Sequence, residues 1–339
     1  MSPLASFIYK SRLYLLARPV YGGIGHIITL HRVVEKREAN RIFWSSNLEV
    51  TTSYLESTIK YFLHNNYDII SLDEMHRRMT QSEFHKKFVV FTFDDGYEDN
   101  FTLAYPIFQK FNLPFAIYIT KALVEMNLKC WWYDLEDILL CYNKINIADL
   151  NLQTQTKEQK EEAFLKLRSL IIHTPFEKGY AFYRTLMAKY PPCKPHAQWS
   201  TMSKEQLLIL NDDPLVTLGA HTVNHYPLSK LQLAEATLEV VESKNYLELL
   251  LQKPVEHFSY PYGSSDEAGE REFEIVKQAG FITATTTRIA NIFREHQNHL
   301  CALPRIPLIE TEEEKKLLKM SLSGFLPAYL HQRKRVVTL

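Results

Sequence analysis

The chain has 339 residues, of which 46% are hydrophobic and 23% are charged, and Lys+Arg and Asp+Glu both number 39. This composition is that of a packed globular protein and excludes a disordered chain, while the balanced charge gives no support to a nucleic-acid partner. The length suits one barrel-type domain with insertions better than a single small core.

The first 22 residues are expected to form a helical segment. The stretch FIYKSRLYLLARPVYGG is apolar, but it carries Lys10, Arg12 and Arg18 and has no small-residue cleavage site of the kind that ends a signal peptide. The four cysteines lie far apart without a C-x-x-C pair, which suits reduced thiols. Both features predict a cytoplasmic protein.

Apolar runs rich in β-formers recur along the chain and alternate with stretches of helical spacing, such as residues 54–65, 232–251 and 270–279. This alternation predicts a mainly parallel sheet covered by helices, and roughly eight runs favour a (β/α) barrel over an open sheet. In such barrels the chemistry lies at the C-terminal ends of the strands. The predicted strands are residues 27–30, 67–72, 88–93, 115–119, 216–219, 257–260, 281–285 and 303–308.

Residues from about 131 to 200 interrupt this alternation. They show no convincing strand, and KEQKEEAFLKLRSL has the pattern of an exposed amphipathic helix. We expect a helical insertion between two strands of a barrel domain that spans residues 23–310.

The C-terminal tail, residues 311–339, is expected to be helical and basic because it joins LLKMSLSGFLPAYL to HQRKR. No run in the chain reaches the roughly 18 to 20 apolar residues that span a bilayer. The apolar and basic ends of the chain either pack on the domain, which we favour, or lie on a membrane surface.

Two carboxylates, Asp94 and Asp95, follow the apolar run FVVFTF directly, and Gly96 permits a tight turn that would aim both into the barrel mouth. Adjacent carboxylates repel each other, and the repulsion is relieved if one of them ligates a cation. An Asp-Asp-Gly sequence is, however, most often a solvated turn.

Two further motifs follow later strands. In GAHTVNH, His221 and His225 are four residues apart, so one helical turn would place both imidazoles on one face, a spacing suited to a metal. In FSYPYG, Pro261 stiffens the backbone between Tyr260 and Tyr262, which offer ring surfaces. Each motif alone also occurs in structural or packing roles, so the prediction depends on all three occurring in order.

Together the motifs predict a catalytic metal site. We assign Asp95, His221 and His225 as ligands and Asp94 as general base. Two imidazoles and one carboxylate leave positions open for water and substrate. Zinc in this site would lower the pKa of a bound water to about 7 and polarise a substrate carbonyl.

The motifs TFDDGY, HTVNH and YPYG resemble, in order and context, the first three motifs of the polysaccharide deacetylases, the NodB-homology or carbohydrate esterase family four. The resemblance runs from about residue 26 to residue 308. It implies a distorted (β/α)7 TIM-like barrel and metal-dependent removal of acetyl groups from N-acetylated sugars. It also implies that Asp94 is the base, that Asp95, His221 and His225 are the ligands, and that the Tyr262 N–H helps to hold the oxyanion.

Two positions depart from the family pattern. Ser259 stands where the family has the arginine that orients the base, and Arg305 in LPRIPL is either its substitute or an ordinary surface or ion-paired arginine. The late Leu-x-His motif, which supplies the general acid in the family, is missing after residue 300. His331 lies in the tail, a position unsuited to that role. A bacterial branch that includes poly-N-acetylglucosamine deacetylases supplies this histidine from an N-terminal strand, which implies that His31 in IITLHRVV is the acid. A histidine at a strand end is also found as a hydrogen-bonded core residue.

We therefore expect a zinc-dependent amidohydrolase that acts on N-acetylhexosamine units of a bacterial polysaccharide or of a glycan precursor, such as a lipid-linked sugar. A cytoplasmic or inner-membrane-associated enzyme suits the sequence. The alternatives are a sugar deformylase, an O-acetyl esterase and a catalytically silent glycan-binding protein. Substrate preference would lie in loops and in the insertion.

Overall fold

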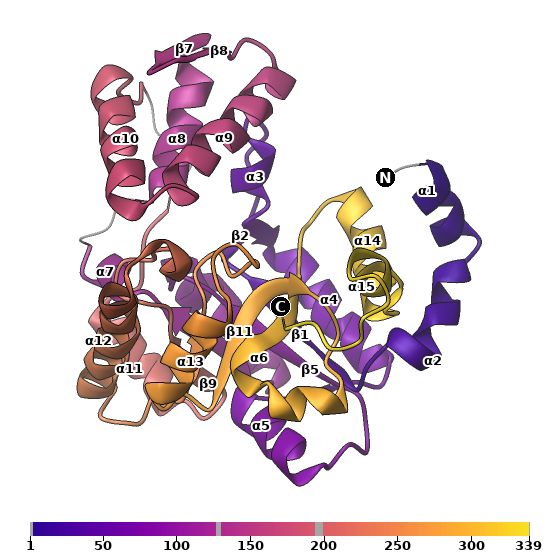
Figure 1. Ribbon diagram of the computed structural model, residues 1–339. Helices are drawn as coiled ribbons and strands as arrows, with labels where there is room; N and C mark the ends of the chain where they lie inside the picture. Colours follow the sequence, from indigo (N-terminus) through magenta and orange to yellow (C-terminus); the bar gives the residue numbers. More distant parts are fainter. Residues whose placement is uncertain (1–2, 127–129, 194–198, 339) are drawn as a thin grey trace.

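Seven parallel strands close into a barrel, with β1 and β5 joining the ends of the sheet (Figure 1). The computed structural model describes residues 3–126, 130–193 and 199–338, so the ends of the chain and residues 194–198 of the expected insertion lie outside the described residues. The predicted distorted (β/α)7 barrel is confirmed. In their order around the ring the strands are β1 (Gly25–Leu30), β12 (Leu303–Pro307), β11 (Thr283–Ile289), β10 (His257–Ser259), β9 (Val216–Ala220), β6 (Phe115–Ile119) and β5 (Phe88–Phe93).

The eighth predicted strand is present, but it lies outside the ring. It is β4 (Asp68–Ile69), which pairs with the first two residues of β5, while β6 pairs with the last two. One edge of β5 is filled by β1, which pairs with all six of its residues. The other edge of β5 is therefore shared by β4 and β6. The barrel is therefore distorted at this junction.

The barrel strands are largely buried because both of their faces are covered. Every residue of β1, β5 and β6 is buried, as expected for parallel strands with a filled interior and an outer layer of helices. The predicted helices 54–65, 232–251 and 270–279 are confirmed as α4, α12 and α13. The helices around the barrel are α4 (Thr52–His64), α5 (Leu72–Gln81), α6 (Tyr105–Phe111), α7 (Lys121–Val124), α11 (Lys204–Asp212), α12 (Leu233–Leu251) and α13 (Glu270–Gln278).

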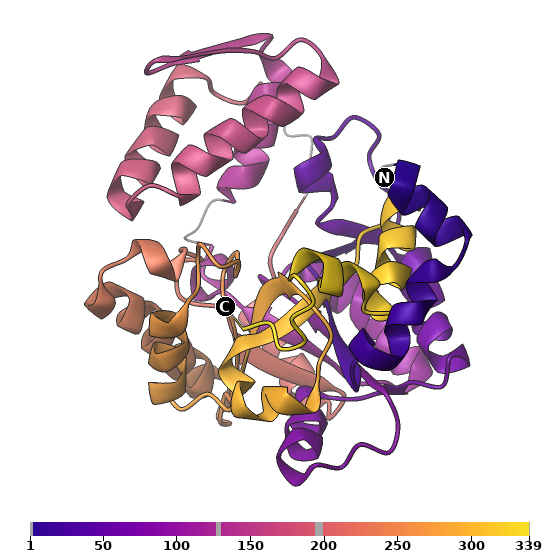
Figure 2. The same ribbon diagram turned by 45° about the vertical axis from the view of Figure 1, so that its right-hand side comes forward.

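A separate lobe stands beside one end of the barrel (Figures 1 and 2). It contains α8 (Trp131–Cys141), α9 (Lys157–Ile172) and α10 (Phe176–Lys189), which pack around their own apolar cluster. The expectation that this region holds no strand is wrong, since β7 (Lys144–Ile147) and β8 (Leu150–Gln153) form an antiparallel hairpin. The hairpin was missed because its strands are only four residues long and because Ala-Asp stands where Asn-Gly would mark the turn.

The helices near the two ends of the chain lie together on another side of the barrel, as both views show (Figures 1 and 2). The N-terminal α1 (Pro3–Lys10) and α2 (Arg18–Tyr21) accompany α14 (Glu312–Leu322) and α15 (Phe325–Leu330), with contacts between α2 and α15. No helix in the described part of the chain combines the length and apolarity needed to cross a bilayer. A short pair, β2 (Arg32–Val34) and β3 (Glu49–Thr51), and the helix α3 (Phe43–Ser46) lead from β1 toward the lobe.

Candidate active site

The two adjacent carboxylates at the end of β5 point to different partners. Asp94 and Asp95 are each 2% exposed, and the backbone turns sharply after them because Asp95 has φ 78° and Gly96 has φ 88°. A left-handed conformation is unfavourable for a non-glycine residue by about 1–3 kcal/mol and is often found at functional sites. This turn separates the two side chains that the sequence places side by side.

Asp94 is held by Arg305 of β12. Guanidinium Nη1 donates to Asp94 Oδ1 at 2.7 Å, and Nη2 donates to Oδ2 at 2.6 Å and to the Ser259 hydroxyl at 3.0 Å. Burial alone would raise the pKa of Asp94, but the charge and hydrogen bonds of Arg305 outweigh it and hold the pKa below its ordinary value. The structure thus brings Arg305, a fully buried residue, to the carboxylate, with Ser259 beside it.

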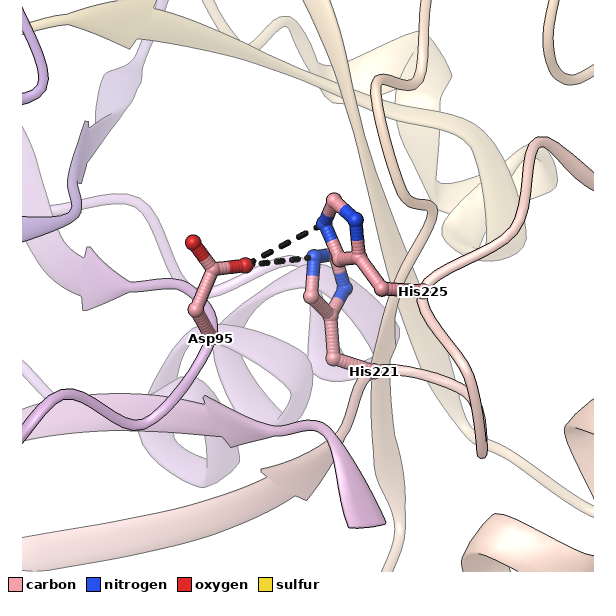
Figure 3. Close-up of side chains that lie close together, drawn as sticks. All are labelled: Asp95, His221 and His225. Atoms are coloured by element: carbon pink, nitrogen blue, oxygen red, sulfur yellow. Dashed lines mark ion pairs between the residues drawn. The ribbon is translucent and has the colours of Figure 1, made fainter. Parts of the chain in front are cut away.

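Asp95, His221 and His225 form a compact group of possible ligands (Figure 3). Asp95 Oδ1 lies 3.2 Å from His225 Nε2 and 3.5 Å from His221 Nε2, and the ligand atoms all lie within 4.8 Å of one another. The three side chains come from the ends of β5 and β9, which are joined through β6 in the barrel wall.

The protonation state of His221 is the one that a metal ligand needs. Its Nδ1–H donates to the Ser259 carbonyl at 2.7 Å, and burial lowers its pKa to about 4, so at neutral pH the ring is uncharged and Nε2 presents a lone pair. Among the described residues, Asp95 Oδ1 has no hydrogen-bond partner although it is buried. Electron pairs that face one another in a buried site are satisfied by a divalent cation.

The predicted helical turn between the two histidines is wrong. Thr222 and His225 both have positive φ, 64° and 57°, and the segment after β9 is a loop. The loop is fixed because Glu239 accepts from the backbone N–H groups of Val223 and Asn224. The imidazole centroids still lie 5.0 Å apart, so a loop achieves the proximity that the four-residue spacing suggested.

The YPYG motif divides between the site and the core. Tyr262 has φ 61°, lines the same cavity as Asp94 and Asp95, and none of the hydrogen bonds between described residues uses its backbone N–H. Tyr260 is buried in the barrel wall, and its hydroxyl donates to the Cys301 carbonyl at 2.9 Å. The structure therefore brings neither the Tyr260 ring nor Pro261 to this cavity.

A cavity of about 210 Å³ gathers the predicted residues at the C-terminal mouth of the barrel. His31, which follows β1, lines it together with Asp94, Asp95, His221, His225 and Tyr262. Sequence reasoning missed the far wall, which α3, α8 and α9 supply. The strongest available signal was the Trp-Trp pair that opens the insertion. The lining residues missed are Trp44, Ser45, Leu48, Trp131, Trp132, Phe164, Arg168 and, on β11, Thr287.

Comparison with known proteins agrees with this architecture. The family described as polysaccharide deacetylase matches residues 81–284, more than half of the chain. YxkH of Bacillus subtilis (strain 168) is 32% identical over 75 residues, which make up 22% of this chain and 27% of YxkH. The aligned segment thus spans little more than a quarter of that curated relative.

Solved structures share the fold at low sequence identity. The Streptococcus pyogenes deacetylase PplD, in complex with acetate, has a TM-score of 0.57 at 18% identity, covering 87% of this chain and 97% of PplD. IcaB from Ammonifex degensii has a TM-score of 0.54 at 14% identity, covering 88% and 97%. The de-N-acetylase from Aggregatibacter actinomycetemcomitans has a TM-score of 0.55 at 15% identity, covering 87% and 99%. The match over residues 81–284, on a barrel of this architecture, makes the chain a member of the polysaccharide deacetylase family, whose members are hydrolytic enzymes.

Proposed function

We propose that this deacetylase removes the N-acetyl group from N-acetylhexosamine units of a bacterial glycan or glycan precursor, and that it needs a divalent metal, most simply zinc. The observation that carries the proposal is the separation of Asp94 from Asp95. One carboxylate is fixed by Arg305, and the other faces the unprotonated nitrogen of a neutral imidazole. The printed description of one structural neighbour as a de-N-acetylase supports the choice of an amide substrate.

A cation held by Asp95, His221 and His225 would supply Lewis acidity to the acetyl carbonyl and to the attacking water. Asp94 accepts the proton of that water, and its two hydrogen bonds to Arg305 keep it ionised at neutral pH and fixed in orientation. The Tyr262 N–H donates to the developing oxyanion.

Departure of the amine needs a proton donor on the same cavity wall. His31 fills this position, because β1 pairs with β5 residue for residue and so delivers His31 to the mouth beside Asp94. A protonated imidazole donates its proton to the nitrogen as the amide C–N bond breaks, which leaves a free amine and acetate.

Acetate release tests the proposal. Chelated and zinc-restored protein are compared on N-acetylated oligosaccharides, with N-formyl and O-acetyl sugars as competing substrates and Asp94→Asn as the control. We expect acetate only from the zinc-restored wild type, and preferentially from amides. A preference for formate or for esters would move the proposal to a deformylase or an esterase, and glycan binding without any turnover would leave a silent binder.

We also propose a cytoplasmic location with contact to an anionic membrane surface through the two ends of the chain. Phe7 (61% exposed), Leu16 (76%) and Tyr329 (78%) are apolar side chains open to solvent, and Lys10 and Arg333 lie near them in the sequence. Sedimentation with vesicles tests the membrane contact, because the protein is expected to bind to anionic but not to zwitterionic vesicles. Equal recovery in the supernatant with both would exclude it.

A further inference from the structure

One cation of the lobe lines the catalytic cavity without an acidic partner. Arg168, near the C-terminal end of α9, shares this cavity with Asp94 and Asp95 and is half-buried. Phe164 lies one turn earlier on α9 and lines the cavity as well, so this face of the helix forms part of the cavity wall. Within the described parts of the chain, Arg168 forms neither an ion pair nor a hydrogen bond. Its positive charge is therefore open to a ligand.

Tyr262 lies between Arg168 and the group of metal-ligating side chains. The Arg168 guanidinium carbon is 5.7 Å from the centroid of the Tyr262 ring, and this ring is 4.9 Å from the centroid of His225. A cation–π contact restrains the guanidinium, while N–H donors of its five remain free for oxygen ligands. Arg168 is thus held one side chain away from the point where the acetyl group would react.

Two buried donors on the same wall also have no acceptor. Ser45 of α3 is 1% exposed and Trp132 of α8 is 7% exposed, and both line this cavity. Neither the Ser45 hydroxyl nor the Trp132 Nε1–H has a hydrogen-bond partner among the described residues. A buried polar group without a partner is unfavourable, so a ligand oxygen that accepts from it stabilises the site.

The carboxylates of this cavity are already engaged. Asp94 binds Arg305 through both of its oxygens, and Asp95 faces the two histidines. The unpartnered donors come from α3, α8 and α9, three separate elements of the wall opposite these carboxylates. A phosphoryl group, with a negative charge and three acceptor oxygens that point in different directions, fits such a set better than a planar carboxylate with two.

We propose that Arg168, together with Ser45 and Trp132, binds a phosphoryl group that is joined to the N-acetylhexosamine. The substrate is then a sugar phosphate, either free or esterified to a lipid carrier, in place of a neutral polysaccharide. The inference rests on the proposed function, because it requires the acetamido group of the same sugar to lie at Asp94. Arg168 determines specificity and takes no part in cleavage of the amide.

Kinetics on charged and neutral probes test the role of Arg168. The probes are N-acetylglucosamine 1-phosphate, its octyl phosphodiester and the neutral methyl N-acetylglucosaminide. The wild type should prefer the phosphates about thirtyfold in kcat/KM, as expected for charge-assisted hydrogen bonds, and Arg168→Gln should reduce the ratio to about one. Arg168→Lys keeps the charge and should retain part of the preference. Lys166→Gln, exposed on the same helix and outside the cavity lining, is the matched control.

The outcomes separate the sources of the phosphoryl group. A higher kcat/KM for the octyl ester supports a lipid-linked sugar, and a higher value for the free phosphate supports a soluble one. Equal losses for charged and neutral probes in Arg168→Gln would show that Arg168 only supports the Tyr262 ring, and would overturn the proposal. Preference for N-acetylmuramate, whose charge is a carboxylate, over the 1-phosphate would overturn it as well.

Binding distinguishes a failure of this inference from a failure of the proposed function. In the zinc-restored Asp94→Asn protein, calorimetric titration should show tighter binding of the 1-phosphate than of the neutral glycoside, and Arg168→Gln in the same background should abolish the difference. This result supports the phosphoryl site even if no acetate is ever released. If the 1-phosphate binds both proteins equally tightly, it binds elsewhere, such as on the metal, and the phosphoryl site is excluded even if acetate release succeeds.

Discussion

Asp94 and Asp95 are neighbours with different surroundings, and this difference carries the functional account. In an extended strand, successive side chains point to opposite faces, and the positive φ of Asp95 turns the second carboxylate toward β9. Asp94 meets a cation that the chain itself provides, Arg305, whereas Asp95 meets two imidazoles. The sequence motif predicts two carboxylates at the mouth of the barrel. The backbone turn determines which of them contacts Arg305 and which contacts the two histidines.

Replacing Arg305 tests how Asp94 is oriented. Arg305→Lys keeps a positive charge but cannot form two parallel hydrogen bonds, so kcat should fall about a hundredfold while bound metal stays constant. The acid limb of the pH profile should move to higher pH, because the pKa of Asp94 is no longer depressed as far and the base protonates earlier. Arg77→Lys, at an exposed pair with Glu83, is the control. An unchanged kcat would mean that Arg305 only stabilises the barrel.

His26 on β1 predicts how stability depends on pH. It is fully buried, its Nδ1–H donates to Asn291 Oδ1 at 2.9 Å, and burial together with the nearby Lys87 lowers its pKa from 6.5 to about 3. Between these two values the unfolded chain binds a proton that the native protein does not, so stability is lost as pH falls below 6.5. Each proton of this kind contributes a slope of about 1.4 kcal/mol per pH unit.

Urea denaturation between pH 6 and pH 4 measures this slope. His26→Gln should reduce the slope of the unfolding free energy with pH by the contribution of about one proton. His64→Gln, on the exposed surface of α4, should leave the slope as in the wild type. The slope is the readout, because the substitution also changes the stability itself. Identical slopes for all three proteins would contradict a neutral His26 in the folded state.

At the scale of elements, a buried ionic network ties the lobe to the barrel. Arg32 and Arg41 share Glu49, and Arg41 also donates to Glu136 in the middle of α8. Glu136 accepts from the Ile42 N–H at 2.7 Å as well. Removing one partner of a buried pair leaves the other charge uncompensated. The network therefore sets the position of the Trp131 and Trp132 wall.

Glu136→Ala should lower the free energy of unfolding by about 3 kcal/mol, because the buried Arg41 loses one of its two carboxylate partners and keeps only Glu49, which it shares with Arg32. Urea denaturation checks this, with Glu56→Ala as the control: Glu56 pairs with Lys60 on an exposed helix face, and its loss should leave stability nearly unchanged. A Glu136→Ala protein as stable as the wild type would show that the network does not hold the lobe.

The elements differ in how well the sequence predicts them. Strands such as β5 and β6 were predictable because they are buried on both faces and read as mainly apolar runs. The β7–β8 hairpin and the loop from His221 to His225 were not, since both depend on short-range backbone choices, such as positive φ at Ala148 and Thr222, that side-chain types there do not signal.

At the scale of the whole molecule, closure of the ring completes the site. His31 and Arg305 lie outside the stretch that matches the family, and they reach Asp94 only because β1 pairs with both β5 and β12. The sequence analysis named both as candidates to replace residues that the family pattern lacks here, but the contact of Arg305 with Asp94 is non-local and needs the barrel. The aromatic wall from the lobe was missed for the same reason.

Zinc content of two neighbouring variants tests the central claim most directly. Wild type, Asp94→Asn and Asp95→Asn are stripped with a chelator, restored with zinc, dialysed and analysed for metal per chain. The account predicts about one zinc in the wild type and in Asp94→Asn, and none in Asp95→Asn, because the first carboxylate serves the reaction and the second holds the metal. Full zinc in Asp95→Asn, or loss of zinc from both variants, would contradict the separation of roles from which the proposed function is argued.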